Sequence, residues 1–168
     1  DGDDLTFFWS FEGDSKEYEG STIDRNFPDK GEYIVVLKVT DSTGLSDEAE
    51  TTVLVVEDYH DEDSGTVSGQ NQEAEVSIPV ENGFVSLSIE YTLERQISGG
   101  TTASVTLRLT DADGVVVDEE EIDCSQLDAC DGTWSYSSDD LSSIGDYVFS
   151  ITREEGTVEW TTTIDVKY

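Results

Sequence analysis

The sequence contains few positively charged residues: 8 Lys and Arg side chains stand against 40 Asp and Glu, so the formal net charge is −32. This charge excludes ordinary nucleic-acid binding, which depends on Lys and Arg to displace counterions from phosphates. It also argues against docking on anionic lipid. Apolar runs of about 18 residues, the length of a membrane span, are absent as well. We expect a soluble piece of a longer protein, with no membrane insertion in this fragment.

Side chains that commonly perform catalysis are also scarce. The only histidine, His60, stands among acidic residues, and no Gly-x-Ser-x-Gly motif or phosphate-binding loop occurs. Paired carboxylates are frequent, but 40 acidic side chains produce such pairs by chance, so they do not indicate a glycosidase. We therefore predict that the protein is not an enzyme.

The only two cysteines, Cys124 and Cys130, lie six positions apart in a polar segment rich in turn formers. We expect a local disulfide that contributes about 2 kcal/mol. Two free thiols and half of a metal site are the alternatives, although a single histidine disfavours zinc. A disulfide supports an extracellular or cell-surface location. The charge adds an expectation of salty or cation-rich surroundings, as for a marine or halophilic microbe.

Alternation of apolar and polar residues dominates the chain, and helical periodicity is nearly absent. Thr6–Phe11 and Tyr33–Thr40 are clear examples, and Asn82-Gly83 predicts a hairpin turn. Val115–Ile122 is expected to continue as a strand into the cysteine segment. Short strands at spacings near ten residues favour antiparallel β-sandwiches. The sequence therefore predicts an all-β protein.

Composition divides this all-β chain into two tandem sandwich domains. An acidic, extended stretch at residues 58–65 ends in Ser-Gly and is the best candidate for a linker. We expect the domains to span residues 1–57 and 66–168.

Three motifs in the first domain follow one another in a specific order. They are Asp1-Gly2-Asp3-Asp4, then Trp9-Ser10-Phe11-Glu12-Gly13-Asp14, and then Gly31-Glu32-Tyr33-Ile34-Val35-Val36-Leu37-Lys38-Val39-Thr40-Asp41-Ser42-Thr43-Gly44. In this order they resemble the polycystic kidney disease (PKD) type domain. The resemblance implies an immunoglobulin-like sandwich over residues 1–57.

Two departures from the PKD pattern matter for the expected sandwich. Glu12 is inserted before Gly13-Asp14, and the family's first strands would lie before Asp1. The resemblance thus implies a sandwich with an open edge, filled by a preceding segment or by a donated strand. The second domain is weakly similar to the jelly-roll modules at the C-terminal ends of secreted proteases and surface proteins.

Calcium is the ligand that best suits so many carboxylates. Oxygen ligands would come from Asp1, Asp3 and Asp4 around Gly2, from Asp111 and Asp113 beside Gly114, and from Asp58, Asp61 and Asp63 in the expected linker. Neither of the first two clusters is an EF-hand loop. The alternative is that Asp-Gly pairs simply form turns.

Aromatic side chains offer a second kind of site. Trp134 and Tyr136 lie among serines next to the cysteine segment, and we expect them to be exposed and able to stack on a sugar. A small local core beside the disulfide is the interpretation that we favour over sugar stacking. Trp160, which begins an alternating apolar face, is expected in the core.

Together these features predict an extracellular structural, adhesion or spacer module of a microbial surface or secreted protein, stiffened by calcium. Its partners would be proteins, polysaccharide surfaces or further copies of itself. One alternative is a carbohydrate-binding accessory module of a secreted hydrolase or protease. The other is a filament or surface-layer subunit that a donated strand completes.

Overall fold

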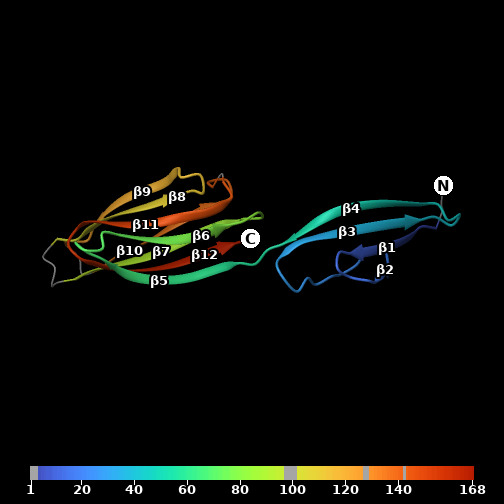
Figure 1. Ribbon diagram of the computed structural model, residues 1–168, viewed down its shortest axis with the longest axis horizontal. Helices are drawn as coiled ribbons and strands as arrows, with labels where there is room; N and C mark the ends of the chain where they lie inside the picture. The colour runs from blue at the N-terminus through green and yellow to red at the C-terminus, as the bar shows by residue number, and fades with distance from the viewer. Residues whose placement is uncertain (1–3, 97–101, 127–128, 142) are drawn as a thin grey trace. The chain divides into compact units, whose positions relative to one another are not determined.

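The computed structural model describes residues 4–96, 102–126, 129–141 and 143–168, and these ranges contain strands but no helix (Figure 1). No helix able to cross a membrane therefore occurs in the described ranges. The chain forms two compact units, residues 1–57 and residues 58–168. All strand pairs are antiparallel, which confirms the all-β prediction.

Unit 1 contains one four-stranded sheet in the order β2-β1-β3-β4. Its strands are β1 (Thr6–Phe11), β2 (Glu17–Glu19), β3 (Gly31–Thr40) and β4 (Ser46–Val55). The register places Trp9 opposite Leu37 and Phe11 opposite Val35, so the apolar residues of β1 and β3 share one face. Phe11 and Val35 are the buried apolar residues of the described part of this unit.

The segment between β2 and β3 covers the end of that apolar face. The centre of the Phe27 ring lies 6.2 Å from that of the Phe11 ring, and the Arg25 guanidinium lies 4.9 Å from the centre of the Phe11 ring. Arg25 also donates to Asp14 at 3.0 Å, which holds the loop in place. The inserted Glu12 is accommodated in the turn after β1, where its N–H donates to the carbonyl of Ile34.

The chain passes through unit 1 from one end to the other. Both β1 and β4 run antiparallel to β3, so they run in the same direction. Thr6, at the start of β1, is paired with Thr40, whereas Val55, at the end of β4, is paired with Gly31 at the opposite end of β3.

Unit 2 is a sandwich of two four-stranded sheets with the orders β10-β7-β12-β5 and β6-β11-β8-β9. The strands are β5 (Tyr59–Val67), β6 (Glu73–Val80), β7 (Ser86–Arg95), β8 (Ser104–Thr110), β9 (Val116–Asp123), β10 (Ala129–Ser137), β11 (Gly145–Glu155) and β12 (Val158–Lys167). Alternate residues of both sheets form a single buried core. Ile89 and Leu107, each 0% exposed, represent the two sheets in it.

The first and last strands of unit 2 are neighbours. Tyr59 is paired with Val166 and Val67 with Val158, so the chain enters and leaves this unit at the same end. Asp58 fastens the two ends together, because its carboxylate accepts from Lys167 Nζ at 2.9 Å and from the N–H of Tyr168 at 3.1 Å.

Two local predictions are wrong. The expected linker at residues 58–65 is mostly strand, since β5 begins at Tyr59 and pairs with β12 along its whole length. The predicted Asn82-Gly83 hairpin is a turn that links β6 to β7, and these strands belong to different sheets. A turn signal shows where the chain reverses, but it does not show which sheet receives the next strand.

Candidate functional site

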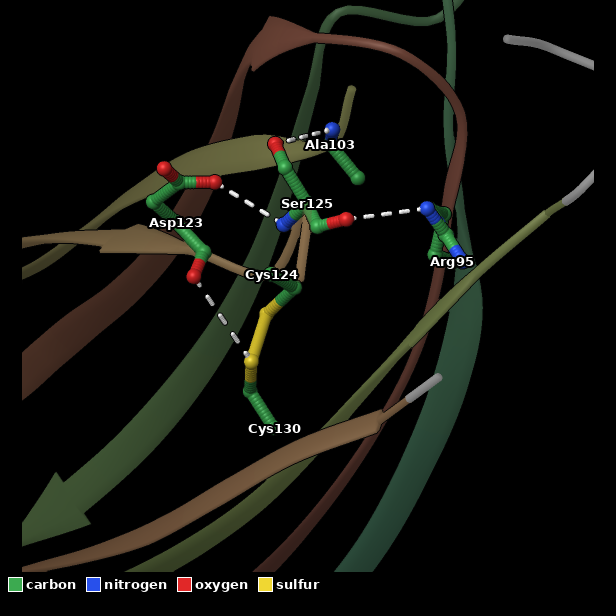
Figure 2. The surroundings of a disulfide bond; sticks show 6 residues. All are labelled: Arg95, Ala103, Asp123, Cys124, Ser125 and Cys130. Carbon is green, nitrogen blue, oxygen red and sulfur yellow. Dashed lines mark hydrogen bonds between the residues drawn. A yellow bond between two sulfur atoms is a disulfide. The ribbon is translucent and has the colours of Figure 1, made fainter. Parts of the chain in front are cut away.

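The predicted disulfide between Cys124 and Cys130 is present (Figure 2). Cys124, 1% exposed, follows β9, and Cys130 lies in β10. Since β9 and β10 are edge strands of different sheets, the bond ties the two layers of the sandwich together. The expected disulfide is local in sequence, yet it joins the two sheets.

Hydrogen bonds around Ser125 fix this corner, as Figure 2 shows. The Ser125 N–H donates to Asp123 Oδ1 at 2.8 Å, and Arg95 donates to the Ser125 carbonyl at 3.0 Å. The Ser125 hydroxyl accepts from the N–H of Ala103 at 3.1 Å. Bonds from Ser125 also lower the pKa of Asp123. The corner is thus a structural clamp of ordinary polar contacts.

The prediction that Trp134 is exposed is wrong. Trp134 is 9% exposed, and its ring meets Phe149 of the opposite sheet edge-on at 5.5 Å. Tyr136 is half-buried on the same face of β10. The favoured interpretation, a local core beside the disulfide, describes both residues. Trp160 is 5% exposed and lies in the core, as predicted.

Carboxylates of β9 face the interior beside these aromatic residues. The register places Glu120 opposite Leu107 and Asp118 opposite Leu109, both of which are core residues. Trp134 Nε1 donates to Glu120 at 3.3 Å, and the Tyr136 hydroxyl donates to Asp118 at 3.1 Å. Burial and the charge of Asp118 raise the pKa of Tyr136. The acids at this edge of the sandwich are therefore provided with hydrogen-bond donors.

The predicted calcium ligands lie in several places. Asp1 and Asp3 fall outside the described residues, and Asp4 is exposed. Asp111 Oδ1 accepts from the N–H groups of Asp113 at 3.0 Å and Val115 at 2.8 Å. Among the described ranges, no three His, Cys, Asp or Glu side chains are grouped so that together they could hold a metal ion. Calcium at Asp111 and Asp113 remains a prediction beside their turn-forming role.

The same turn occurs in unit 1. Asp41 Oδ1 accepts from the N–H groups of Thr43 and Leu45, and Gly44 adopts a positive φ of 89° as Gly114 does at 80°. The hydrogen bonds of Asp41 lower the pKa of its carboxyl. This repetition favours the turn-forming role.

The acids of the expected linker are divided between two places. Asp58 is engaged by Lys167 and Tyr168 at the end of unit 2. Asp61 and Asp63 lie further along β5, on the face that carries Val67 into the core. Sequence reasoning missed this inward direction because it read the segment as extended and solvated.

A shallow groove lies on the outer face of the β10-β7-β12-β5 sheet. It has a volume of about 360 Å³ and is lined by Ser64, Gly65, Thr66, Thr92, Glu94, Glu159, Trp160 and Thr161. Its side chains are mostly hydroxyls and carboxylates contributed by β5, β7 and β12. Sequence analysis did not single out this groove, because its members come from three separate strands.

Comparison with known families finds a match for the segment that forms unit 1. Residues 1–56 match the sequence model of the PKD domain family, which confirms the resemblance of this segment. No curated protein matches the chain.

Solved structures give weaker likenesses over more of the chain. A carbohydrate-binding module of the β-sandwich superfamily has 17% identity and a TM-score of 0.35, over 96% of this chain and 82% of its own. Clostridium perfringens ZmpB, with its M60 catalytic, CBM51-1 and CBM51-2 domains, has 13% identity and a TM-score of 0.42, over 82% of this chain and 18% of its own. The VP2 subviral particle of infectious bursal disease virus has 12% identity and a TM-score of 0.38, over 97% of this chain and 52% of its own. The chain spans about half of the length of the VP2 chain and less than a fifth of the length of the ZmpB chain.

Proposed function

We propose that the protein is a non-catalytic extracellular accessory module, in which unit 1 is a spacer and unit 2 presents a binding surface. The observation that carries this proposal is the difference in how the chain passes through the units. In unit 1 the chain enters and leaves at opposite ends of β3. In unit 2 it enters and leaves at one end, where Tyr59 pairs with Val166.

These paths have different mechanical consequences. Tension on the ends of unit 1 pulls β1 and β4 along β3 in opposite directions. All the hydrogen bonds between paired strands then resist the force at the same time. Tension on the ends of unit 2 separates β5 from β12 one hydrogen-bonded pair at a time, beginning beside Asp58. Because its chain ends are adjacent, such a unit does not lengthen a stalk. It is better suited to presenting a binding surface than to resisting tension.

Force spectroscopy on the full chain tests this assignment. Unit 2 is pulled from handles at residues 58 and 168, and in a second version from handles at residues 58 and 155. Glu155 lies at the other end of the sandwich, so the second geometry shears β5 along β12. We expect unit 2 to unfold at the lower force in the first geometry. Equal forces, or a higher force in the first geometry, would contradict the proposed division of roles.

The outer groove of unit 2 supports polysaccharide binding as a second function. Threonine and serine hydroxyls and the carboxylates of Glu94 and Glu159 present both donors and acceptors for sugar hydroxyls. The exposed aromatic platform predicted from the sequence does not contribute, because Trp134 is buried. Any binding through this groove would rest on hydrogen bonds rather than on stacking.

Affinity electrophoresis in gels that contain soluble polysaccharides tests this function. We expect retardation that the Thr92→Ala, Thr161→Ala double variant lowers at least tenfold in apparent affinity. Thr133→Ala, on the outward face of β10, serves as the matched control and should retain binding. Retardation that is absent, or equal in both variants, would exclude the groove.

A further inference from the structure

The inward-facing carboxylates at the two open sides of the unit 2 sandwich differ in the hydrogen-bond donors that they meet. At the side formed by β9 and β10, Glu120 and Asp118 accept hydrogen bonds from Trp134 and Tyr136. At the side where β5 is the edge, the register places Asp63 opposite Thr162 and Asp61 opposite Ile164. Since Thr162 and Ile164 are 2% and 1% exposed, both aspartates project from the core face of β5.

Few groups offset the charge of Asp61 and Asp63. The Tyr59 hydroxyl donates to Asp61 at 3.2 Å, and the N–H of Ser64 donates to Asp63 at 2.7 Å. None of the ion pairs among the described residues involves either carboxylate. Residues two apart on one strand face lie about 7 Å from each other, so the two negative charges repel.

Thr162 supplies an independent sign that something is bound beside these acids. Its Oγ1 is buried and has no hydrogen-bond partner in the described structure. A buried hydroxyl without a partner destabilises the folded state, because its hydrogen bonds to water are lost and not replaced. Strand pairing puts Thr162 directly across from Asp63, so the two side chains lie on the same face of the sheet.

We propose that Asp61, Asp63 and Thr162 form a binding site for a hard divalent cation, with calcium as the fitting ion, on the inner edge of β5. Carboxylate and hydroxyl oxygens are the ligands calcium takes, and its flexible coordination suits an irregular set completed by water. Asp63 is exposed, so the ion can enter from the open edge of the sheet. This site goes beyond the proposed function and belongs to unit 2 alone.

Both acids affect the neighbouring Tyr59. Burial raises the pKa of its hydroxyl, and the charges of Asp61 and Asp63 raise it further. A tyrosine this close to the site provides a spectroscopic reporter, because tyrosine transfers excitation to a bound Tb³⁺ ion, which replaces Ca²⁺.

The experiment uses the full chain with CaCl₂, with NaCl at equal ionic strength, and with EDTA. In the wild type we expect a rise in Tm of several degrees in 10 mM Ca²⁺ that NaCl does not reproduce, together with Tb³⁺ luminescence that Ca²⁺ displaces. The Asp61→Asn, Asp63→Asn double variant should lose at least tenfold in Ca²⁺ affinity. Glu62→Gln removes a charge from the outward face of the same strand and should retain the affinity.

Thr162→Val keeps the shape of the side chain and removes its hydroxyl. We expect a higher Tm in EDTA, because the unpartnered group is gone, and a weaker response to Ca²⁺. An unchanged response to Ca²⁺ in this variant would overturn the site as assigned. So would equal stabilisation by NaCl and CaCl₂, or equal Ca²⁺ affinities in the double variant and the Glu62→Gln control. If the double variant failed to fold, Thr162→Val and the salt comparison would still decide.

Discussion

Trp134 shows how a residue's direction decides its role. Its neighbours Thr133 and Ser135 are polar and exposed, and they suggested a solvated segment. The alternation of β10 nevertheless turns Cys130, Trp134 and Tyr136 to the same inner side. The alternation of residues along β10 can be seen in the sequence. Without a known partner strand, however, it does not show which of the two alternating sets faces the core.

Replacing Trp134 with Ala should therefore lower stability and leave binding at the surface unaffected. We expect unit 2 to lose about 3–5 kcal/mol in free energy of unfolding, because a large buried ring and its contact with Phe149 are removed. Urea denaturation measures the loss. Ser135→Ala, one position away on the outer face, should change stability by less than about 0.5 kcal/mol. Similar losses in both variants would place Trp134 outside the core.

His60 gives a pH dependence that is also a property of single residues. Its Nδ1 lies 2.9 Å from Asp165 Oδ1, and this hydrogen bond raises the pKa of His60 above 6.5. A pKa raised in the folded state means that the stabilisation is fully present below the unfolded pKa. It is lost as pH rises through the folded value.

This histidine is the only one in the chain, so its ring signals in an NMR titration are unambiguous. We expect the titration midpoint to lie above that of a free histidine and to fall in Asp165→Asn. The Lys167→Gln variant alters the next outward-facing position on β12 and controls for a change of charge nearby. A midpoint unaffected by Asp165→Asn would show that the bond does not form in solution.

At the scale of strands, the packing of β5 against β12 depends on the close approach of the Gly65 backbone to the ring of Trp160. A Cβ atom added to Gly65 would lie 2.8 Å from a ring carbon of Trp160, the residue with which Gly65 is paired. Gly65→Ala should thus push the buried indole out of place and cost about 1–3 kcal/mol. Thermal unfolding measures the loss. Gly69→Ala is the control, since nothing lies within 4 Å of its added Cβ; equal effects would contradict this packing.

The disulfide is a covalent cross-link between the edge strands of the two sheets. We expect the Cys124→Ser, Cys130→Ser double variant to lose about 2 kcal/mol of stability, since the short loop it closes restricts the unfolded chain. Chemical denaturation with and without a reductant checks the value. Reductant should lower the wild type to the level of the variant and leave the variant unchanged. A wild type insensitive to reductant would show that the bond adds nothing.

Strand predictions succeeded for β1 and β3, whose inward residues are apolar, and failed for β5. Thr6–Phe11 was predicted with the bounds that β1 has, and Tyr33–Thr40 falls within β3. β5 was missed because Asp61, Asp63 and Gly65 occupy its inner positions. Inward charges are a known means of protecting edge strands from pairing with other chains. The pattern that hides β5 from sequence analysis is thus a consequence of its place at the edge.

At the scale of the whole chain, composition located a boundary near the one that the structure has. The units divide between Glu57 and Asp58, at the start of the acidic segment. The segment itself belongs to unit 2, because its pairing with β12 is contributed by residues about 100 positions away. No local signal reports such a partner. The outer groove and the Asp63–Thr162 pair escaped prediction for the same reason.

The adjacent ends of unit 2 also make it easy to transplant. Because Asp58 and Tyr168 are hydrogen-bonded to each other, the unit would fit into a surface loop of an unrelated host without forcing the host's flanking residues apart. For the same reason, a short peptide joining residue 168 to residue 58 would allow new chain ends to be opened at the Asn82-Gly83 turn, with every strand pairing retained. This topology would let a gene acquire or discard the unit as an insertion, and not only by addition at a terminus.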